Sequence, residues 1–167
     1  SKKNLGAGGG RNLGAKHASG ELLLFLDSDN IVEKSMVERL SLFISENKEC
    51  GMVGPLMLYQ KNPKMIWLSF ADIDMFTSQA KYKGTGKNIR SIKSADPIRV
   101  GHLPNCFMVR KDDFKAAGGF DEKYLVMFEE ADIAEKIKNK LGKSIILLPK
   151  AITFHDVPLP VKKGRDE

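Results

Sequence analysis

The pattern of apolar and polar positions along the chain predicts strands that alternate with helices. A continuous apolar run from Leu22 to Leu26 lies between glycine and acidic turn residues, which is typical of a strand covered on both faces. Residues 33–46 repeat apolar positions at helical spacing, and residues 129–141 do the same. This alternation indicates an α/β sandwich.

Three further segments have strand character: residues 51–59, 105–110 and 144–149. Pro55 interrupts the first of them, which favours an edge position or a bulge because proline has no N–H to donate. A short helix follows residue 110 and ends at the glycine pair 118–119. Residues 60–100 show no clear pattern, and we interpret them as a long excursion of the kind that often carries function.

Composition and charge limit the class of protein. The 167 residues, 42% hydrophobic and 29% charged, are typical of one globular domain with a sizeable core. A net charge of +6 is compatible with anionic ligands such as nucleotides or sugar and lipid phosphates, but there is no dense basic stripe for nucleic acid. Cys50 and Cys106 form neither a CxxC motif nor a zinc spacing, so we expect buried thiols in a reducing compartment.

Two aspartates follow the first strand in the stretch "FLDSDN", residues 25–30. Ligands of open α/β sheets gather beyond the carboxyl ends of the strands. In an extended segment Asp27 and Asp29 would point to the same side, and two oxygen ligands there suit Mg²⁺ or Mn²⁺. Taken alone, the pair is a weak sign of metal binding and is better explained by a strand-end turn with a helix N-cap.

The stretch "NLGAGGGRNLG", residues 4–14, is rich in glycine. We interpret it as a loop whose backbone approaches an anion, ahead of a helix that aims its N-terminus at phosphate. Arg11 adds a fixed positive charge. No strand precedes the segment and no GK[ST] follows it, so it is neither a dinucleotide fingerprint nor a P-loop, and a plain flexible loop stays open.

Two more groups of polar residues are candidates for chemistry. Glu129, Glu130 and Asp132 gather at a predicted helix start, where the helix dipole explains one or two acids and a general base in a cleft is the alternative. His155 and Asp156 follow the last predicted strand. A histidine there is either structural or a metal ligand through its neutral imidazole.

The order of these motifs resembles family 2 glycosyltransferases with the GT-A fold. The resemblance rests on four segments: "NLGAGGGRNLGAKHASGELLLFLDSD", "FMVRKDDFKAAGGFDE", "FEEADIAEKI" and "FH". It implies a three-layer α/β sandwich with a mixed, mostly parallel sheet that is incomplete at the N-terminus. Residues 1–157 would be the C-terminal part of the GT-A domain and residues 158–167 a polar tail. The family's nucleoside-binding strands are not in this sequence, so we expect a fragment of a longer enzyme that is poorly active alone.

The resemblance also implies roles on the donor side. Asp29 and His155 would bind Mn²⁺ or Mg²⁺, which holds the diphosphate of a nucleotide-sugar. Asp27 would lie near the sugar or its ribose. Arg11 and Asn12 would line the donor site.

On the acceptor side, the resemblance assigns the catalytic base to Glu130, where the family has aspartate. Residues 118–121 would shape the acceptor site. The implied reaction moves a sugar from a nucleoside-diphosphate sugar to a hydroxyl of a glycan or lipid-linked acceptor, with inversion. We expect no nucleic-acid partner, and a cytoplasmic location with peripheral membrane association at the inner face. The alternatives are a nucleotidyltransferase and a non-catalytic glycan-binding domain of the same fold.

Overall fold

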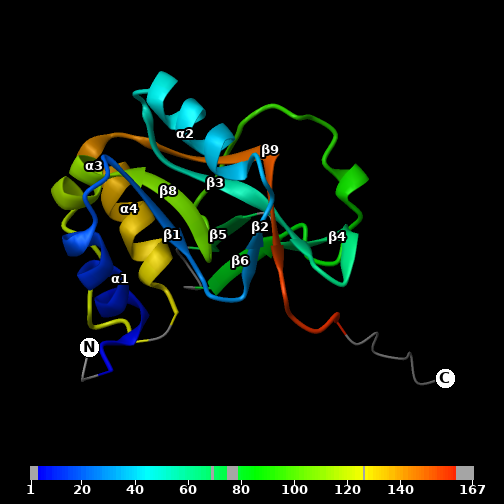
Figure 1. Ribbon diagram of the computed structural model, residues 1–167, viewed down its shortest axis with the longest axis horizontal. Coiled ribbons are helices and arrows are strands. Elements are labelled where there is room, and N and C mark those ends of the chain that lie inside the picture. Colours follow the sequence, from blue (N-terminus) through cyan, green and yellow to red (C-terminus); the bar gives the residue numbers. More distant parts are fainter. Residues whose placement is uncertain (1–3, 69, 75–78, 126, 161–167) are drawn as a thin grey trace.

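Helices cover both faces of a central sheet, so that the molecule has three layers (Figure 1). The computed structural model describes residues 4–68, 70–74, 79–125 and 127–160. The α-helices within these residues are α1 (Gly6–His17), α2 (Met36–Glu46), α3 (Lys111–Ala117) and α4 (Glu129–Leu141). Helix α2 packs on one face and the other three lie on the opposite face, which confirms the predicted three-layer α/β architecture.

The main sheet has the strand order β1-β8-β3-β9-β2, with β4 paired to β3 and β7 paired to β9. Its strands are β1 (Leu22–Leu26), β2 (Asn30–Val32), β3 (Cys50–Tyr59), β4 (Asn62–Leu68), β7 (Ile98–Arg99), β8 (Cys106–Arg110) and β9 (Ser144–His155). A separate hairpin joins β5 (Phe70–Asp74) to β6 (Gln79–Lys83), and a 3-10 helix, η1, spans Ile89–Ser91.

The sheet is mixed but mostly antiparallel, so the prediction of a mostly parallel sheet is wrong. Among the described strands only β3 and β9 pair in parallel. The other pairs of the main sheet are all antiparallel. The error has a physical cause: an unbroken apolar run reports that both faces of a strand are covered, and it carries no information about the direction of its neighbours.

Strand β1 is covered on both faces, as its apolar run predicted. Leu23 and Phe25 join the core cluster under α1, α3 and α4, while Leu22 and Leu24 pack against the cluster under α2. The ring of Phe25 lies 5.2 Å, centroid to centroid, from each of three other phenylalanine rings: Phe107, Phe114 and Phe120. This aromatic group holds α3 and the glycine pair that follows it against the sheet.

Several predicted elements are confirmed, some of them with shifted bounds. Helix α4 spans the predicted residues, and α3 ends at Gly118, whose φ of 98° is the left-handed conformation that favours glycine. Strand β3 lies inside the sheet, with a register shift against β9 after Pro55, so the residue marks a bulge and not an edge. The segment 60–100 is not patternless, because it holds β4 to β7 and η1, whose strands are short or partly polar.

The glycine-rich segment is a correction to the sequence analysis. Residues predicted as a phosphate-binding loop form α1, and Arg11 lies in the middle of that helix. A Cβ atom on Gly8 would lie 3.2 Å from the Cβ of Phe120, so a side chain at that position would crowd the neighbouring segment. Close tertiary packing therefore accounts for a glycine that helix propensity alone disfavours.

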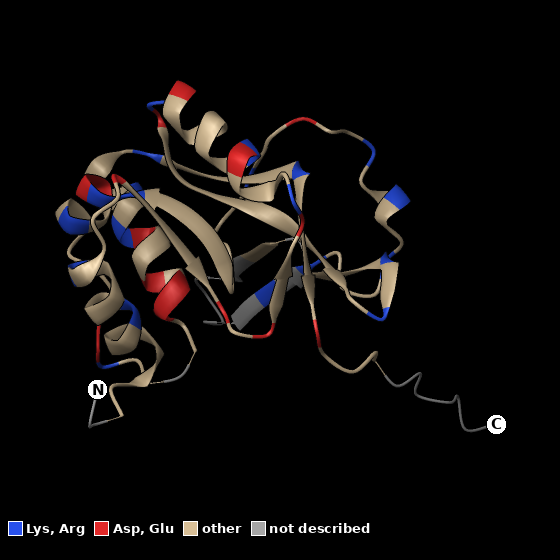
Figure 2. Ribbon diagram, viewed as in Figure 1, with Lys and Arg blue, Asp and Glu red and all other residues tan. Residues whose placement is uncertain are grey.

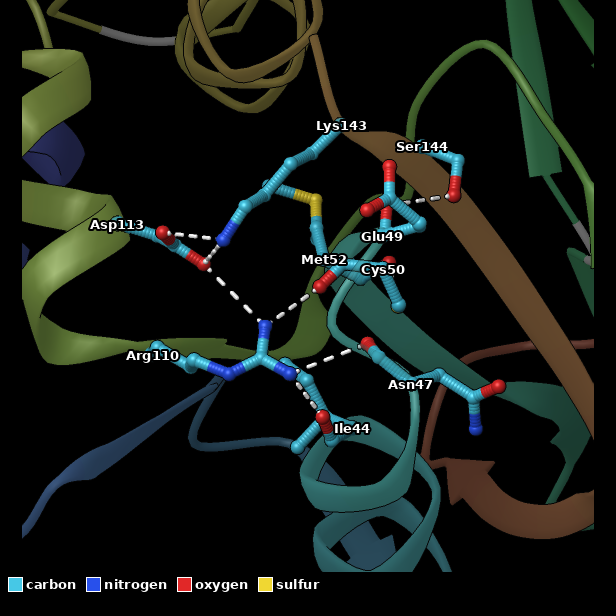
Figure 3. A network of polar contacts seen from close by, with 9 residues as sticks. All are labelled: Ile44, Asn47, Glu49, Cys50, Met52, Arg110, Asp113, Lys143 and Ser144. Atoms are coloured by element: carbon cyan, nitrogen blue, oxygen red, sulfur yellow. Dashed lines mark hydrogen bonds and ion pairs between the residues drawn. The ribbon is translucent and has the colours of Figure 1, made fainter. Parts of the chain in front are cut away.

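Arg110 ties the end of α2 to the sheet (Figure 3). Its guanidinium donates hydrogen bonds to the backbone carbonyls of Ile44, Asn47 and Cys50. The same guanidinium lies 3.3 Å from Asp113, which also accepts two hydrogen bonds from Lys143 at 2.6 and 2.7 Å. The contact with Ile44 satisfies a carbonyl that the last turn of α2 leaves without a partner, and the other contacts join that helix end to the start of β3.

Both cysteines are buried and unpaired, as predicted. Burial raises the pKa of Cys50 to about 11 and that of Cys106 to about 12, so both thiols stay protonated at neutral pH. The predicted polar tail begins with residues 158–160, which have no regular structure, and residues 161–167 lie outside the described part. Across the described ranges, no helix combines the length and the apolar character needed to cross a membrane.

The packing of α1 predicts opposite effects for two of its glycines. Gly10→Ala should stabilise the protein by about 0.5–1 kcal/mol, because alanine has the higher helix propensity and its Cβ would meet nothing within 4 Å. Gly8→Ala should instead destabilise by about 1 kcal/mol, because its Cβ crowds Phe120. Urea unfolding of both variants checks this, and equal shifts in the two would contradict the close approach of α1.

Candidate functional site

A pocket of about 490 Å³ opens where α1, the end of β1, β4 and the start of α4 come together. It is lined by Ala7, Arg11, Asp27, Trp67, Leu68, Thr85, His102, Pro104, Asn105, Met127, Phe128, Glu129, Glu130 and Ala131. Four residues that the sequence analysis named as candidates are among them: Arg11, Asp27, Glu129 and Glu130. Segments far apart in the chain therefore converge on one cavity.

Arg11 is the centre of this site. Its guanidinium lies 2.6 Å from Asp27, 2.8 Å from Glu129 and 3.2 Å from Glu130. The Arg11 side chain is only 15% exposed, and it also lies over the ring of Phe120, 5.6 Å from the centroid. One cation thus holds three carboxylates that belong to two different segments of the chain.

The start of α4 presents its acids to Arg11 through an unusual backbone turn. Met127 and Phe128 have φ angles of 70° and 67°, a left-handed conformation that costs energy for residues with a side chain. The turn ends at Phe128, which precedes the first helical residue, Glu129. Glu129 and Glu130 then lie in the first turn of α4, where the helix dipole favours negative charge.

Glu130 has the properties of a weak acid held in a cleft. Burial raises its pKa above the ordinary value of 4.5, Arg11 opposes that shift, and the nearby Glu129 adds to it. The backbone N–H of Asn105 lies 3.4 Å from its carboxylate. A carboxylate with a raised pKa is a better proton acceptor than an exposed one.

Asp29 and His155 form a second polar group beside the pocket, outside its lining. Their nearest side-chain atoms, Asp29 Oδ1 and His155 Nε2, are 3.3 Å apart. The imidazole stacks on the indole of Trp67 with ring centroids 4.0 Å apart and an interplanar angle of 18°. The buried His155 ring is therefore fixed in orientation, whereas Asp29 is 49% exposed.

The "FLDSDN" stretch is a turn and not an extended segment. The backbone N–H of Asn30 donates to the carbonyl of Asp27 over 3.2 Å, which closes the turn between β1 and β2. Asp27 pairs with Arg11 and Asp29 lies against His155, so the two aspartates have different partners. The expectation that extended geometry places them side by side is wrong, because the chain reverses at this point.

The donor set of Asp29 and His155 is compatible with two ligands of a divalent cation. Among the described residues, neither this position nor any other has a group of three or more His, Cys, Asp and Glu side chains that could hold a metal ion. Mg²⁺ and Mn²⁺ commonly complete six ligands with water and substrate phosphate oxygens, so two protein ligands suffice. His155 Nδ1 is buried and finds no hydrogen-bond partner in the described part of the chain, so the ring is oriented by its stacking on Trp67 and by the contacts of Nε2 with Asp29 and Asn105.

Asn12 lies away from the pocket lining and holds the segment after α3. Its side-chain amide donates to the carbonyl of Phe120 over 3.0 Å and accepts from the N–H of the same residue over 3.0 Å. It also donates to Glu122 over 3.1 Å. The structure therefore places Asn12 as a link between α1 and the predicted acceptor segment, residues 118–121.

Sequence reasoning did not single out Trp67 or Asn105. Asn105 joins the two polar groups: its N–H faces Glu130, its side chain lies 3.3 Å from His155, and its carbonyl accepts from the N–H of Asp27. Its φ of 58° is the left-handed conformation that asparagine tolerates. Trp67 is the single tryptophan of the chain, and this was the one signal in the sequence that could have marked it as a candidate site residue.

In a comparison with protein-family models, the chain matches Glycosyl transferase family 2 over residues 1–117. The chain belongs to this family. No curated protein matches the chain. The family model covers α1, both aspartates of the β1–β2 turn and α3, while α4 and His155 lie beyond it.

Solved structures share the GT-A fold of this family 2 chain. A structure of GalNAc-T7 with UDP, GalNAc and Mn²⁺ has a TM-score of 0.74 at 18% identity, over 95% of this chain and 32% of that one. TarS of S. aureus in complex with UDP has a TM-score of 0.57 at 20% identity, over 93% of this chain and 41% of that one. The chain thus spans less than half the length of these two structures.

The carboxylate cluster predicts a pH-dependent loss of stability when its cation is removed. Arg11→Met leaves three carboxylates around an apolar side chain and should cost about 3 kcal/mol at pH 7.5. The folded-state pKa of Glu130, already raised by burial, should rise further in the variant. An acid whose pKa is higher in the folded state than in the unfolded state destabilises the fold as the pH rises through that pKa. The loss of unfolding free energy in Arg11→Met should therefore shrink when the pH falls toward 4.5.

Urea unfolding of Arg11→Met and the parent protein at pH 5 and pH 7.5 measures this effect. Arg90→Met is the matched control, since Arg90 is an exposed residue of η1 that does not line the pocket. The same deficit at both pH values would show that Arg11 acts through packing alone.

Proposed function

We propose that this chain is the catalytic part of an inverting, metal-dependent glycosyltransferase. It would move a sugar from a nucleoside-diphosphate sugar to a hydroxyl of a glycan or lipid-linked acceptor. The observation that carries the proposal is that Arg11 joins Asp27, from the expected donor side, to Glu130, from the expected acceptor side, in one pocket. Membership of glycosyl transferase family 2 supports the reaction class.

The donor would lie across the β1–β2 turn, where Asp27 and Asp29 are found. Asp27 is fixed by Arg11 and would accept hydrogen bonds from the sugar or its ribose. Asp29 and His155 would hold the divalent cation, which stabilises the negative charge of a departing nucleoside diphosphate. GalNAc-T7, which shares the fold, was crystallised with UDP and Mn²⁺, which supports a diphosphate and a cation here.

Glu130 would act as the general base for the acceptor hydroxyl. It lines the pocket, and its raised pKa improves its ability to take a proton while Arg11 keeps a share of it ionised. The acceptor oxygen would then attack the anomeric carbon on the face opposite to the leaving diphosphate, with inversion. The proton of the hydroxyl ends on a Glu130 oxygen and the bond to the diphosphate breaks.

The metal assignment predicts how nucleotide binding responds to substitution. In the full-length protein, Asp29→Ala should weaken Mn²⁺-dependent binding of nucleoside diphosphates about 100-fold, because half of the protein ligand pair is lost. Calorimetry with a panel of nucleoside diphosphates, with and without Mn²⁺, measures it. Asp112→Asn, at an exposed position in α3, is the control. Binding that ignores Mn²⁺, or an Asp29→Ala variant that binds normally, would remove the assignment.

The base assignment predicts a separation of binding from turnover. Glu130→Gln should bind nucleoside diphosphate normally and lose transfer by a factor of about 100 or more, because the amide cannot accept the proton. Glu130→Asp, which introduces the family's residue, should keep much of the activity. The measurement is release of nucleoside diphosphate from nucleotide-sugars, with and without a glycan acceptor panel. A Glu130→Gln variant that turns over at the parent rate would exclude Glu130 as base.

A further inference from the structure

A second pocket, of about 320 Å³, has no part in the proposed sugar transfer. It is lined by Ile66, Phe70, Lys83, Gly84, Lys87, Ser91, Ile92, Lys93, Ser94, Ile98 and Leu147. Its size falls at the lower end of the range that small-molecule sites occupy. We refer to it below as the lysine pocket.

The rim of the lysine pocket is positively charged. Residues 81–99 carry six lysines and arginines and one acid, Asp96, so that this segment holds most of the net positive charge of the chain. Figure 2 shows blue segments on β6, on η1 and at the adjoining turn of β4, besides others on α3 and α4. Asp96 accepts a hydrogen bond from Ser94 over 2.6 Å, and no ion pair engages Lys87 or Lys93 within the described residues.

The floor of the lysine pocket is apolar. Ile66 and Leu147 are fully buried, and three partly buried residues complete the floor: Phe70, Ile92 and Ile98. Among the residues whose side chains the structure describes, no acid lines the cavity. A cationic rim above an apolar floor matches an amphiphilic anion, because the charged group stays near water while the apolar part is removed from it.

Backbone hydrogen bonds fix the position of the rim. Gly84 and Gly86 have φ angles of 82° and 75°, which allow a tight turn between β6 and η1. The N–H of Gly86 donates to the carbonyl of Ile66 over 2.9 Å, and the N–H of Ile66 donates to the carbonyl of Lys87 over 2.8 Å. Lys87 is therefore anchored to β4, so its backbone needs little ordering when a ligand binds.

The lysine pocket and the pocket around Arg11 lie on two sides of one wall. Along β4, Ile66 lines the lysine pocket and Trp67 lines the pocket around Arg11. In the glycine turn, Gly84 faces the first of these and Thr85 the second. A molecule in the lysine pocket is thus one β-strand away from the site that contains Glu130.

We propose that the lysine pocket binds a phosphate ester with an apolar substituent. The phosphate would lie between Lys87 and Lys93, with Ser91 and Ser94 within the same lining, and the apolar part would pack on Ile66 and Leu147. A membrane phospholipid and a soluble phosphate ester share this chemistry. The inference concerns binding alone and does not depend on sugar transfer.

Calorimetry on the full-length protein tests the proposal with three probes: dihexanoyl phosphatidic acid, dihexanoyl phosphatidylcholine and inorganic phosphate. The two lipids are used below their critical micelle concentrations. Phosphatidic acid should bind about tenfold or more tightly than either of the others, because it alone offers both the net charge and the apolar part. The double variant Lys87→Gln/Lys93→Gln should lose about tenfold or more of that affinity. Ile92→Asn should weaken phosphatidic acid and leave phosphate unchanged.

The matched control is Lys16→Gln/Lys48→Gln, which removes the same charge from exposed positions on α1 and after α2. Equal losses in both double variants would mean that net charge alone attracts the lipid, which overturns the proposal. Phosphate or phosphatidylcholine binding as tightly as phosphatidic acid, or no binding of phosphatidic acid, would overturn it as well.

Two further measurements identify the source and separate this inference from the proposed function. Pelleting with phosphatidic-acid vesicles indicates a membrane lipid, whereas binding of the monomeric lipid alone indicates a soluble ester. Mn²⁺-dependent nucleoside diphosphate binding, measured in the same double variants, should be unchanged. Its absence from the parent protein would contradict the donor site and leave the lysine pocket standing.

Discussion

The site depends on one guanidinium placed among three carboxylates. Asp27, Glu129 and Glu130 repel one another in a half-buried pocket, and Arg11, which lies 2.6–3.2 Å from each, offsets part of that repulsion. The arrangement requires α1 to lie close to the segment before α4, which is possible because Gly8 has no side chain. The glycine-rich stretch thus serves the site by letting a helix approach, and its backbone does not form a loop.

Burial separates the acids of this molecule into two chemical classes. Glu130 lies in the pocket with a raised pKa and a fixed partner, which suits proton transfer. Asp29 is half exposed and faces an imidazole that Trp67 holds by stacking, which suits a cation brought in with a phosphate ligand. Asn105 connects the two groups, with its N–H toward Glu130 and its side chain toward His155.

Strand β4, in the segment 60–100, contributes residues to both pockets. Trp67 and Thr85 belong to the pocket around Arg11, while Ile66, Gly84 and the neighbouring lysines belong to the lysine pocket. Ile66 lines the lysine pocket and the two residues after it, Trp67 and Leu68, line the pocket around Arg11, so one short strand contributes to two cavities. The segment with the weakest pattern in the sequence therefore forms the wall between them.

Local patterns in the sequence determined the helix Glu129–Leu141, the buried strand Leu22–Leu26 and the glycine end of α3, because helical periodicity, apolar runs and turn chemistry act over a few residues. The order of the motifs was enough to indicate the family. Strand direction, the helical state of the glycine-rich stretch, the separate partners of Asp27 and Asp29, and the role of Asn105 were decided only by the tertiary structure. Each of these depends on contacts between residues far apart in the chain, and the free energy of such contacts outweighs local propensity.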